Sequence, residues 1–125
     1  MFWRPNSSKF TPPYDVIELA GKIIVMVEVA GMSASDLKIS LSRDRLVVTG
    51  IRHRPNLDSQ AAHHRVEIGF GEFRLEVPLS WSVEQGLVSA SYRDGFLQIE
   101  LPRHTEKRIR INNLEKQQDE TADDE

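Results

Sequence analysis

The residues best suited to acid–base or metal chemistry are the four histidines, His53, His63, His64 and His104. His63 and His64 are adjacent, and neighbouring side chains on a strand point to opposite faces, so the pair is poorly placed to bind one ion. The chain has no cysteine, and no acidic residue stands at ligand spacing from the pair. We therefore expect neither a metal site nor a cofactor.

Motifs of enzyme active sites do not occur in the sequence. There is no glycine-rich phosphate-binding loop, no nucleophile elbow and no pair of carboxylates within a recognisable catalytic motif. Serines and histidines are present, but no spacing joins them into a nucleophile and its base. The absence of cysteine also excludes a thiol nucleophile and a disulfide framework. The sequence therefore predicts a protein that is not an enzyme.

The most distinctive spacing is that of Ile109 and Ile111, in the segment "EKRIRINN" at 106–113. Side chains two residues apart on an extended chain project to the same side, so both isoleucines would fit a groove with two adjacent apolar pockets. Pro102 and the charged residues after it argue against continuation of the preceding strand. Extension of the chain's own sheet nevertheless stays open as an alternative.

Composition and charge place the chain among ordinary globular proteins. It has 125 residues, 39% hydrophobic and 28% charged, which fits one domain. The net charge of −3 gives no reason to expect nucleic acid as a partner. No apolar run is long enough for a signal peptide or a membrane span. We expect a cytoplasmic protein without a membrane partner, and the acidic segment 115–125 is expected to act as a solubilising tail.

The dominant hydrophobic period is two, which is typical of strands with one buried face. The alternation predicts seven or eight short strands between Tyr14 and Leu101, mostly antiparallel. Because one sheet cannot cover its own apolar face, we expect an all-β sandwich of two sheets. Turns are predicted at 42–45 and 93–96, and helix only near 33–36 and 113–120. The runs that carry the strand pattern are 15–19, 22–31, 36–42, 45–51, 66–70, 73–79, 87–92 and 96–101.

Three parts follow from this pattern: an N-terminal arm at 1–13, a β domain at 14–102 and a C-terminal extension at 103–125. The arm carries Phe2, Trp3 and Phe10 among prolines. Aromatic side chains on such a segment can contact exposed apolar patches of many proteins, so the three are candidates for binding unfolded clients. The alternative, that they pack inside an assembly, has equal weight.

The stretch "ASYRDGFLQIELP", from Ala90 to Pro102, resembles the signature of the small heat-shock proteins, with Ala90, Gly95 and Leu97 at its characteristic positions. The order of the strand patterns and the later Ile109-x-Ile111 match the same family. The resemblance covers about residues 14–111 and is to the bacterial type. It implies an alpha-crystallin domain, which is an immunoglobulin-like antiparallel β-sandwich, and an ATP-independent holdase that binds partly unfolded proteins.

The resemblance also implies how such a protein assembles. A dimer would form by exchange of a strand from the loop at 52–64, which would pair with Asp15–Leu19 of the other subunit. Dimers would then join through Ile109 and Ile111, bound in a groove on a neighbour. The implied exchange residues are Gln60, Ala61, Ala62, His63, His64 and Arg65, and the implied groove residues are Leu37, Ile39, Leu41, Val88 and Ala90.

One position departs from the family's pattern, and one rival interpretation has to be weighed. Many members carry an arginine where this sequence has Leu75, so that dimer-interface arginine cannot be transferred here. The rival interpretation is a CS-domain co-chaperone, a monomeric adaptor with a similar sandwich. The long loop at 52–64 and the Ile109-x-Ile111 motif favour the self-assembling family.

Overall fold

Most of the segments whose hydrophobic residues alternate with a period of two form strands. The computed structural model describes residues 10–104 and 109–113. Within them the strands are β1 (Tyr14–Leu19), β2 (Lys22–Glu28), β3 (Leu37–Leu41), β4 (Arg45–Arg52), β5 (Gly71–Pro78), β6 (Ser89–Arg93) and β7 (Phe96–Pro102). Two short 3₁₀ helices accompany them, η1 (Ala34–Asp36) and η2 (Gln85–Leu87).

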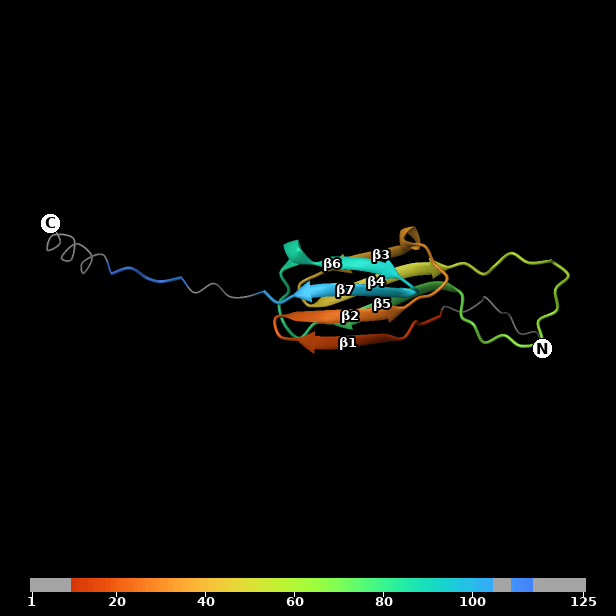
Figure 1. Ribbon diagram of the computed structural model, residues 1–125, viewed down its shortest axis with the longest axis horizontal. Helices are drawn as coiled ribbons and strands as arrows, with labels where there is room; N and C mark the ends of the chain where they lie inside the picture. The colour runs from red at the N-terminus through yellow and green to blue at the C-terminus, as the bar shows by residue number, and fades with distance from the viewer. Residues whose placement is uncertain (1–9, 105–108, 114–125) are drawn as a thin grey trace.

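The strands form two antiparallel sheets that pack face to face (Figure 1). One sheet has four strands in the order β1-β2-β7-β6, and the other has three in the order β3-β4-β5. The structure confirms the predicted all-β sandwich. The edges of the two sheets are β1 and β6 in the first, and β3 and β5 in the second.

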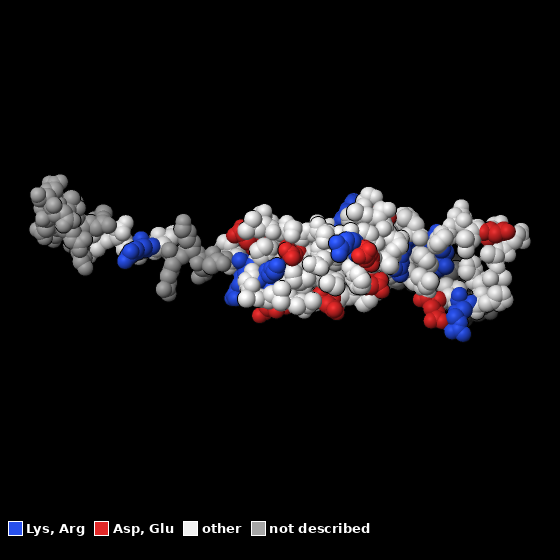
Figure 2. Space-filling view, viewed as in Figure 1, with Lys and Arg blue, Asp and Glu red and all other residues white. Residues whose placement is uncertain are grey.

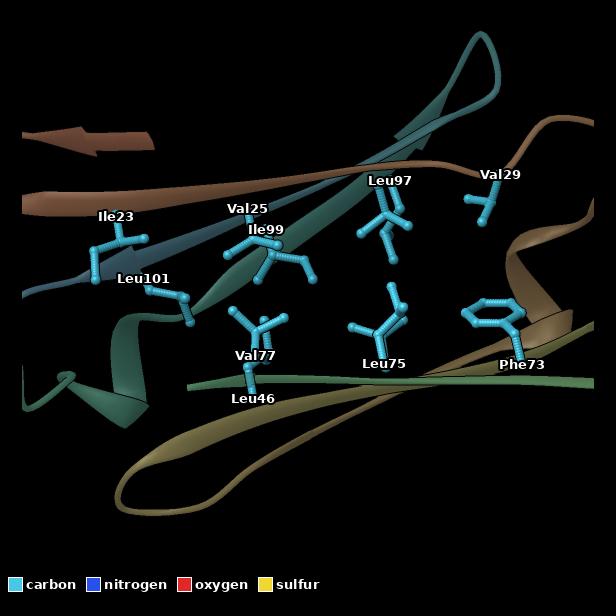
Figure 3. Packing of buried hydrophobic residues seen from close by; sticks show 12 residues of the cluster. Ile23, Val25, Val29, Leu46, Phe73, Leu75, Val77, Leu97, Ile99 and Leu101 are labelled. Atoms are coloured by element: carbon cyan, nitrogen blue, oxygen red, sulfur yellow. The ribbon is translucent and has the colours of Figure 1, made fainter. Parts of the chain in front are cut away.

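The core lies between the sheets and consists of the inward-facing residues of the alternating pattern (Figure 3). Leu75 is one of them and is 3% exposed, so this position, discussed above for its lack of an arginine, carries a core residue. Burying a side chain of this size contributes roughly 1.5–3 kcal/mol. The cluster comprises Ile23, Val25, Val27, Val29, Leu46, Val48, Phe73, Leu75, Val77, Leu97, Ile99 and Leu101.

The predicted turn between β6 and β7 is present at Asp94 and Gly95. Their φ angles are 55° and 85°, so both residues have the left-handed conformation of the tightest hairpin turn. The Gly95 carbonyl accepts a hydrogen bond of 2.8 Å from the Val29 amide. A Cβ at Gly95 would lie 3.0 Å from Cβ of Ala30, so glycine is needed here for both conformation and space.

The strand predicted at 66–70 is wrong for the single chain. Residues 53–70 form no strand and leave the end of the sandwich as a long loop (Figure 1). The ladder between β4 and β5 ends at the pair Arg52 and Gly71, so residues before Gly71 have no strand beside them. The helix expected near 33–36 is the 3₁₀ turn η1, whereas η2 was not predicted.

One glycine in β4 makes room for an aromatic ring of β5. Gly50 lies directly opposite Phe73 in the ladder. A Cβ at Gly50 would be 2.6 Å from Cε2 of Phe73 and 3.0 Å from the carbonyl oxygen of Asp36. The ring thus occupies the volume that a side chain at position 50 would need.

We predict that Gly50→Ala lowers the free energy of unfolding by about 1–3 kcal/mol, because the added methyl group overpacks this contact. Gly86→Ala is the matched control, since a Cβ there would meet nothing within 4 Å. The control should change stability by at most about 1 kcal/mol, in the stabilising direction. Urea unfolding at one fixed protein concentration measures both, and equal midpoints would contradict the packing argument.

Candidate functional site

The first candidate surface is the open edge of β1. This strand pairs only with β2, and all six of its residues are exposed. Tyr14 and Val16 lie opposite Val27 and Val25 of β2, yet they are 38% and 49% exposed whereas those core valines are fully buried. The narrower second sheet therefore does not cover the inner face of β1.

The outer face of β1 is also apolar. Ile17 and Leu19 are 40% and 45% exposed, and their alternation with Val16 and Glu18 puts them on the opposite face of the strand. An exposed edge strand with apolar residues on both faces is a template for pairing with another strand. The acceptor segment implied by the resemblance, Asp15–Leu19, lies within this strand.

The loop between β4 and β5 contains the residues expected to supply the exchanged strand. Gln60 to Arg65 are all exposed, and the contacts that shape this part of the loop are local. Asp58 accepts two hydrogen bonds, from the Gln60 amide to Oδ1 at 2.8 Å and from the Ala61 amide to its carbonyl at 3.0 Å. Leu57 and Ile68, on either side of this segment, are 71% and 64% exposed.

The candidate groove lies along the edges formed by β3 and β6. These strands follow the same side of the sandwich in Figure 1. Tyr92 of β6 connects them at one end, because its hydroxyl donates to the Val29 carbonyl at 2.7 Å and accepts from the Met32 amide at 3.3 Å. Met32 belongs to the connector that leads to β3.

Four of the five expected groove residues lie on the inward faces of these two edge strands, and the fifth, Val88, directly precedes β6. Leu37, Leu41 and Val88 are half-buried and pack against the core. Ile39 lies on the same face of β3 as the two leucines but is 36% exposed. Ala90, on β6, is also exposed. A strip of apolar surface is therefore left between the edges, and the small side chain of Ala90 leaves space above it.

Ile109 and Ile111 are 81% and 92% exposed. They belong to a segment, 109–113, that forms no strand, and Figure 1 shows this segment beyond the end of the sandwich. The alternative in which the pair extends the chain's own sheet is not found in the structure. Among the residues that the structure describes, the two side chains are left almost fully exposed to solvent.

The start of the C-terminal extension is held against the sandwich by contacts that the sequence did not predict. The Arg103 guanidinium lies 4.6 Å above the Trp81 ring, and its amide donates to the Gly21 carbonyl at 2.9 Å. Nδ1 of His104 lies 2.9 Å from Oε2 of Glu84. No spacing in the sequence pointed to these pairs, because the partners lie far from Arg103 and His104 along the chain and in no regular pattern.

The structure describes one of the three candidate residues for client binding. Phe2 and Trp3 lie outside the described residues. Phe10 is half-buried, with its ring 5.3 Å from that of Phe73 and with the Arg52 guanidinium 4.3 Å above it. A role of the three in client binding stays a prediction.

Other kinds of site find little support in the part of the chain that the structure describes. No group of three or more histidine, aspartate or glutamate side chains there is placed to hold a metal ion. No helix among those residues is long and apolar enough to cross a membrane. On the face shown in Figure 2, acidic and basic side chains are interspersed over the sandwich.

Comparison with known proteins agrees with this architecture. The chain is 28% identical over 111 residues to Spore protein SP21 of Stigmatella aurantiaca, an alignment that spans 86% of the chain and 66% of that protein. It is 28% identical over 92 residues to a probable 15 kDa heat shock protein of Leptospira interrogans, covering 74% of the chain and 69% of the relative. The chain thus spans about two thirds of the length of these relatives.

A solved small heat-shock protein from Xylella fastidiosa, described as having a distinct high order structure, superposes with a TM-score of 0.70. The two are 22% identical, and the superposition covers 85% of this chain and all of the other, so they share a fold. The model of the Hsp20/alpha crystallin family matches residues 15–116. The chain therefore belongs to the Hsp20/alpha crystallin family, the small heat shock proteins.

Proposed function

We propose that this protein is an ATP-independent chaperone, a holdase, which binds partly unfolded proteins and limits their aggregation while assembled into dimers and larger oligomers. The observation that carries the proposal is the near-complete exposure of Ile109 and Ile111. Membership of the small heat shock protein family supports the same function. A cytoplasmic location is part of the proposal and is checked by cell fractionation.

The dimer would form by strand exchange. Residues Gln60–Arg65 of one copy would pair with β1 of the other, and the reverse pairing would complete a symmetric dimer. The open edge of β1 and the exposed loop support this arrangement. Main-chain hydrogen bonds would give affinity, and burial of the exposed apolar side chains of β1 would add to it.

Larger assemblies would form when Ile109 and Ile111 occupy the strip between β3 and β6 of a neighbour. Burying one isoleucine contributes roughly 1.5–3 kcal/mol, whereas association costs an estimated 4–15 kcal/mol in lost freedom. A single contact of this kind is therefore weak and reversible. Many contacts in one assembly gain avidity because each later contact is intramolecular.

We predict that replacing Ile109 and Ile111 together by alanine lowers the oligomer mass measured by light scattering to that of the dimer. Arg110→Ala is the matched control, because its side chain projects away from the isoleucines on an extended segment. The control should keep the original mass. An unchanged mass in the double variant would contradict the role of the motif.

The groove is tested from the other side with Ile39→Asp, which places a charge on the apolar strip and should also reduce the oligomer to dimers. Ser40→Asp introduces the same charge at the neighbouring position, on the opposite face of β3, and should leave the mass unchanged. Equal masses for the two variants would show that the motif binds elsewhere.

Holdase activity predicts that the purified protein suppresses the heat-induced aggregation of a model client without ATP, as measured by light scattering. Deletion of residues 1–11 tests the contribution of the aromatic arm, and full retained protection would dismiss the arm as a client site. A protein that is strictly monomeric and does not suppress aggregation would instead favour the adaptor function of a CS-domain co-chaperone.

A further inference from the structure

Three segments that are distant in the sequence meet at the end of the sandwich where the exchange loop leaves and returns. Arg52 is the last residue of β4, Gly69 precedes β5, and Phe10 precedes β1. The Arg52 guanidinium contacts the Phe10 ring, the Gly69 carbonyl and the connector after β2. Its contacts define what we call the Arg52 clamp: Arg52, Gly69, Phe10 and Ala30.

The guanidinium donates two hydrogen bonds to one carbonyl near the end of the loop, just before β5. Nε and Nη2 of Arg52 donate to the Gly69 carbonyl at 2.9 and 2.6 Å. Nη1 donates to the Ala30 carbonyl at 3.1 Å, in the connector after β2. A planar fork of this kind is specific to arginine, because lysine has a single nitrogen at the end of its side chain.

Phe10 completes the clamp from the side of the N-terminal arm. Its ring lies beneath the Arg52 guanidinium at 4.3 Å and packs against Phe73 at 5.3 Å. A Cβ at Gly69 would be 2.5 Å from Cβ of Phe10, so the absence of a side chain lets the loop backbone lie directly on the phenylalanine. Pro12, two residues further, is fully buried and anchors the arm on the same body.

The loop is therefore held at its two ends. Its outer part, residues 55–64, is shaped by the local turn at Asp58. Because the direction of an otherwise exposed loop depends on how its ends are fixed, the clamp sets where Gln60–Arg65 point relative to the sandwich.

We infer that Arg52 is the positioning residue for strand exchange and that it couples the exchange loop to the N-terminal arm through Phe10. The inference rests on the proposed strand-exchanged dimer. When Phe10 is in the clamp, the loop is directed for pairing with the second copy. Withdrawal of Phe10, by a client or by another segment, frees the Gly69 end of the loop and loosens the dimer.

The first measurement asks whether the exchanged dimer exists. The chain has no cysteine, so single cysteines report contacts cleanly. A ¹⁵N-labelled Val16→Cys protein is mixed with unlabelled Ala62→Cys or Ala61→Cys protein, which sample both faces of the exchanged strand, and is oxidised mildly. A disulfide of mixed mass is expected from one of the two loop positions. No mixed product with Arg52 intact would refute the dimer itself.

The second measurement tests whether the contacts of Arg52 and Phe10 slow the exchange of subunits between dimers. Labelled and unlabelled full-length proteins without added cysteines are mixed, and native mass spectrometry follows the appearance of mixed dimers, which form only when the original dimers separate. Arg52→Lys and Phe10→Ala should each accelerate subunit exchange about five- to thirtyfold, the effect of losing one or two charge-assisted or ring contacts. Because both changes open the same clamp, the double variant should exchange no faster than about the faster single variant.

Two controls separate positioning from general stability. Arg93→Lys makes the same substitution at an exposed site on β6 and should leave the exchange rate unchanged. Val77→Ala weakens the core at the end of β5 distant from the loop, and it should lower the unfolding midpoint without comparable acceleration. If the cross-link of the first measurement forms, the inference is overturned when Arg52→Lys leaves the exchange rate unchanged or when Val77→Ala accelerates exchange equally.

Discussion

A four-stranded sheet packed on a three-stranded sheet leaves one strand with nothing opposite its inner face. This mismatch in width determines which part of the sandwich is left open for contact with another molecule. The strand left over is β1, and every one of its residues is exposed. Because β1 has apolar side chains on both faces, the single chain leaves these side chains exposed to water. The core between the sheets closes well, because every member of the cluster is at 3% exposure or less.

The two segments that leave the sandwich begin in the same way. The exchange loop starts at Arg52, whose guanidinium covers Phe10, and the C-terminal extension starts at Arg103, whose guanidinium covers Trp81. An arginine on an aromatic ring combines a cation–π contact with hydrogen bonding at the rim of the guanidinium. The body of the domain thus determines the directions of segments that lie largely outside it.

Much of the architecture was readable from the sequence, because it depends on local rules. Alternation predicted the strands and the two sheets, and Asp94-Gly95 predicted its hairpin. The segment 66–70 was misread, because its alternation is genuine but a strand also needs a neighbour, and β4 ends at Arg52. The positions of the groove residues came from resemblance, and the structure shows their inward parity on β3 and β6.

The Arg52 clamp was beyond sequence reasoning for a different reason. Phe10, Arg52 and Gly69 have no regular spacing, and arginine side chains have too many conformations for a partner to be read from residue type. The same holds for the contacts of Trp81 and Glu84 with the start of the extension. Those contacts also set the reach of the extension: Ile109 stands five positions after His104, and five extended residues span at most about 18 Å. Any groove that receives the motif must begin within that radius of the anchored residue, which limits how far apart neighbouring subunits can lie and how strongly an assembly of them can curve.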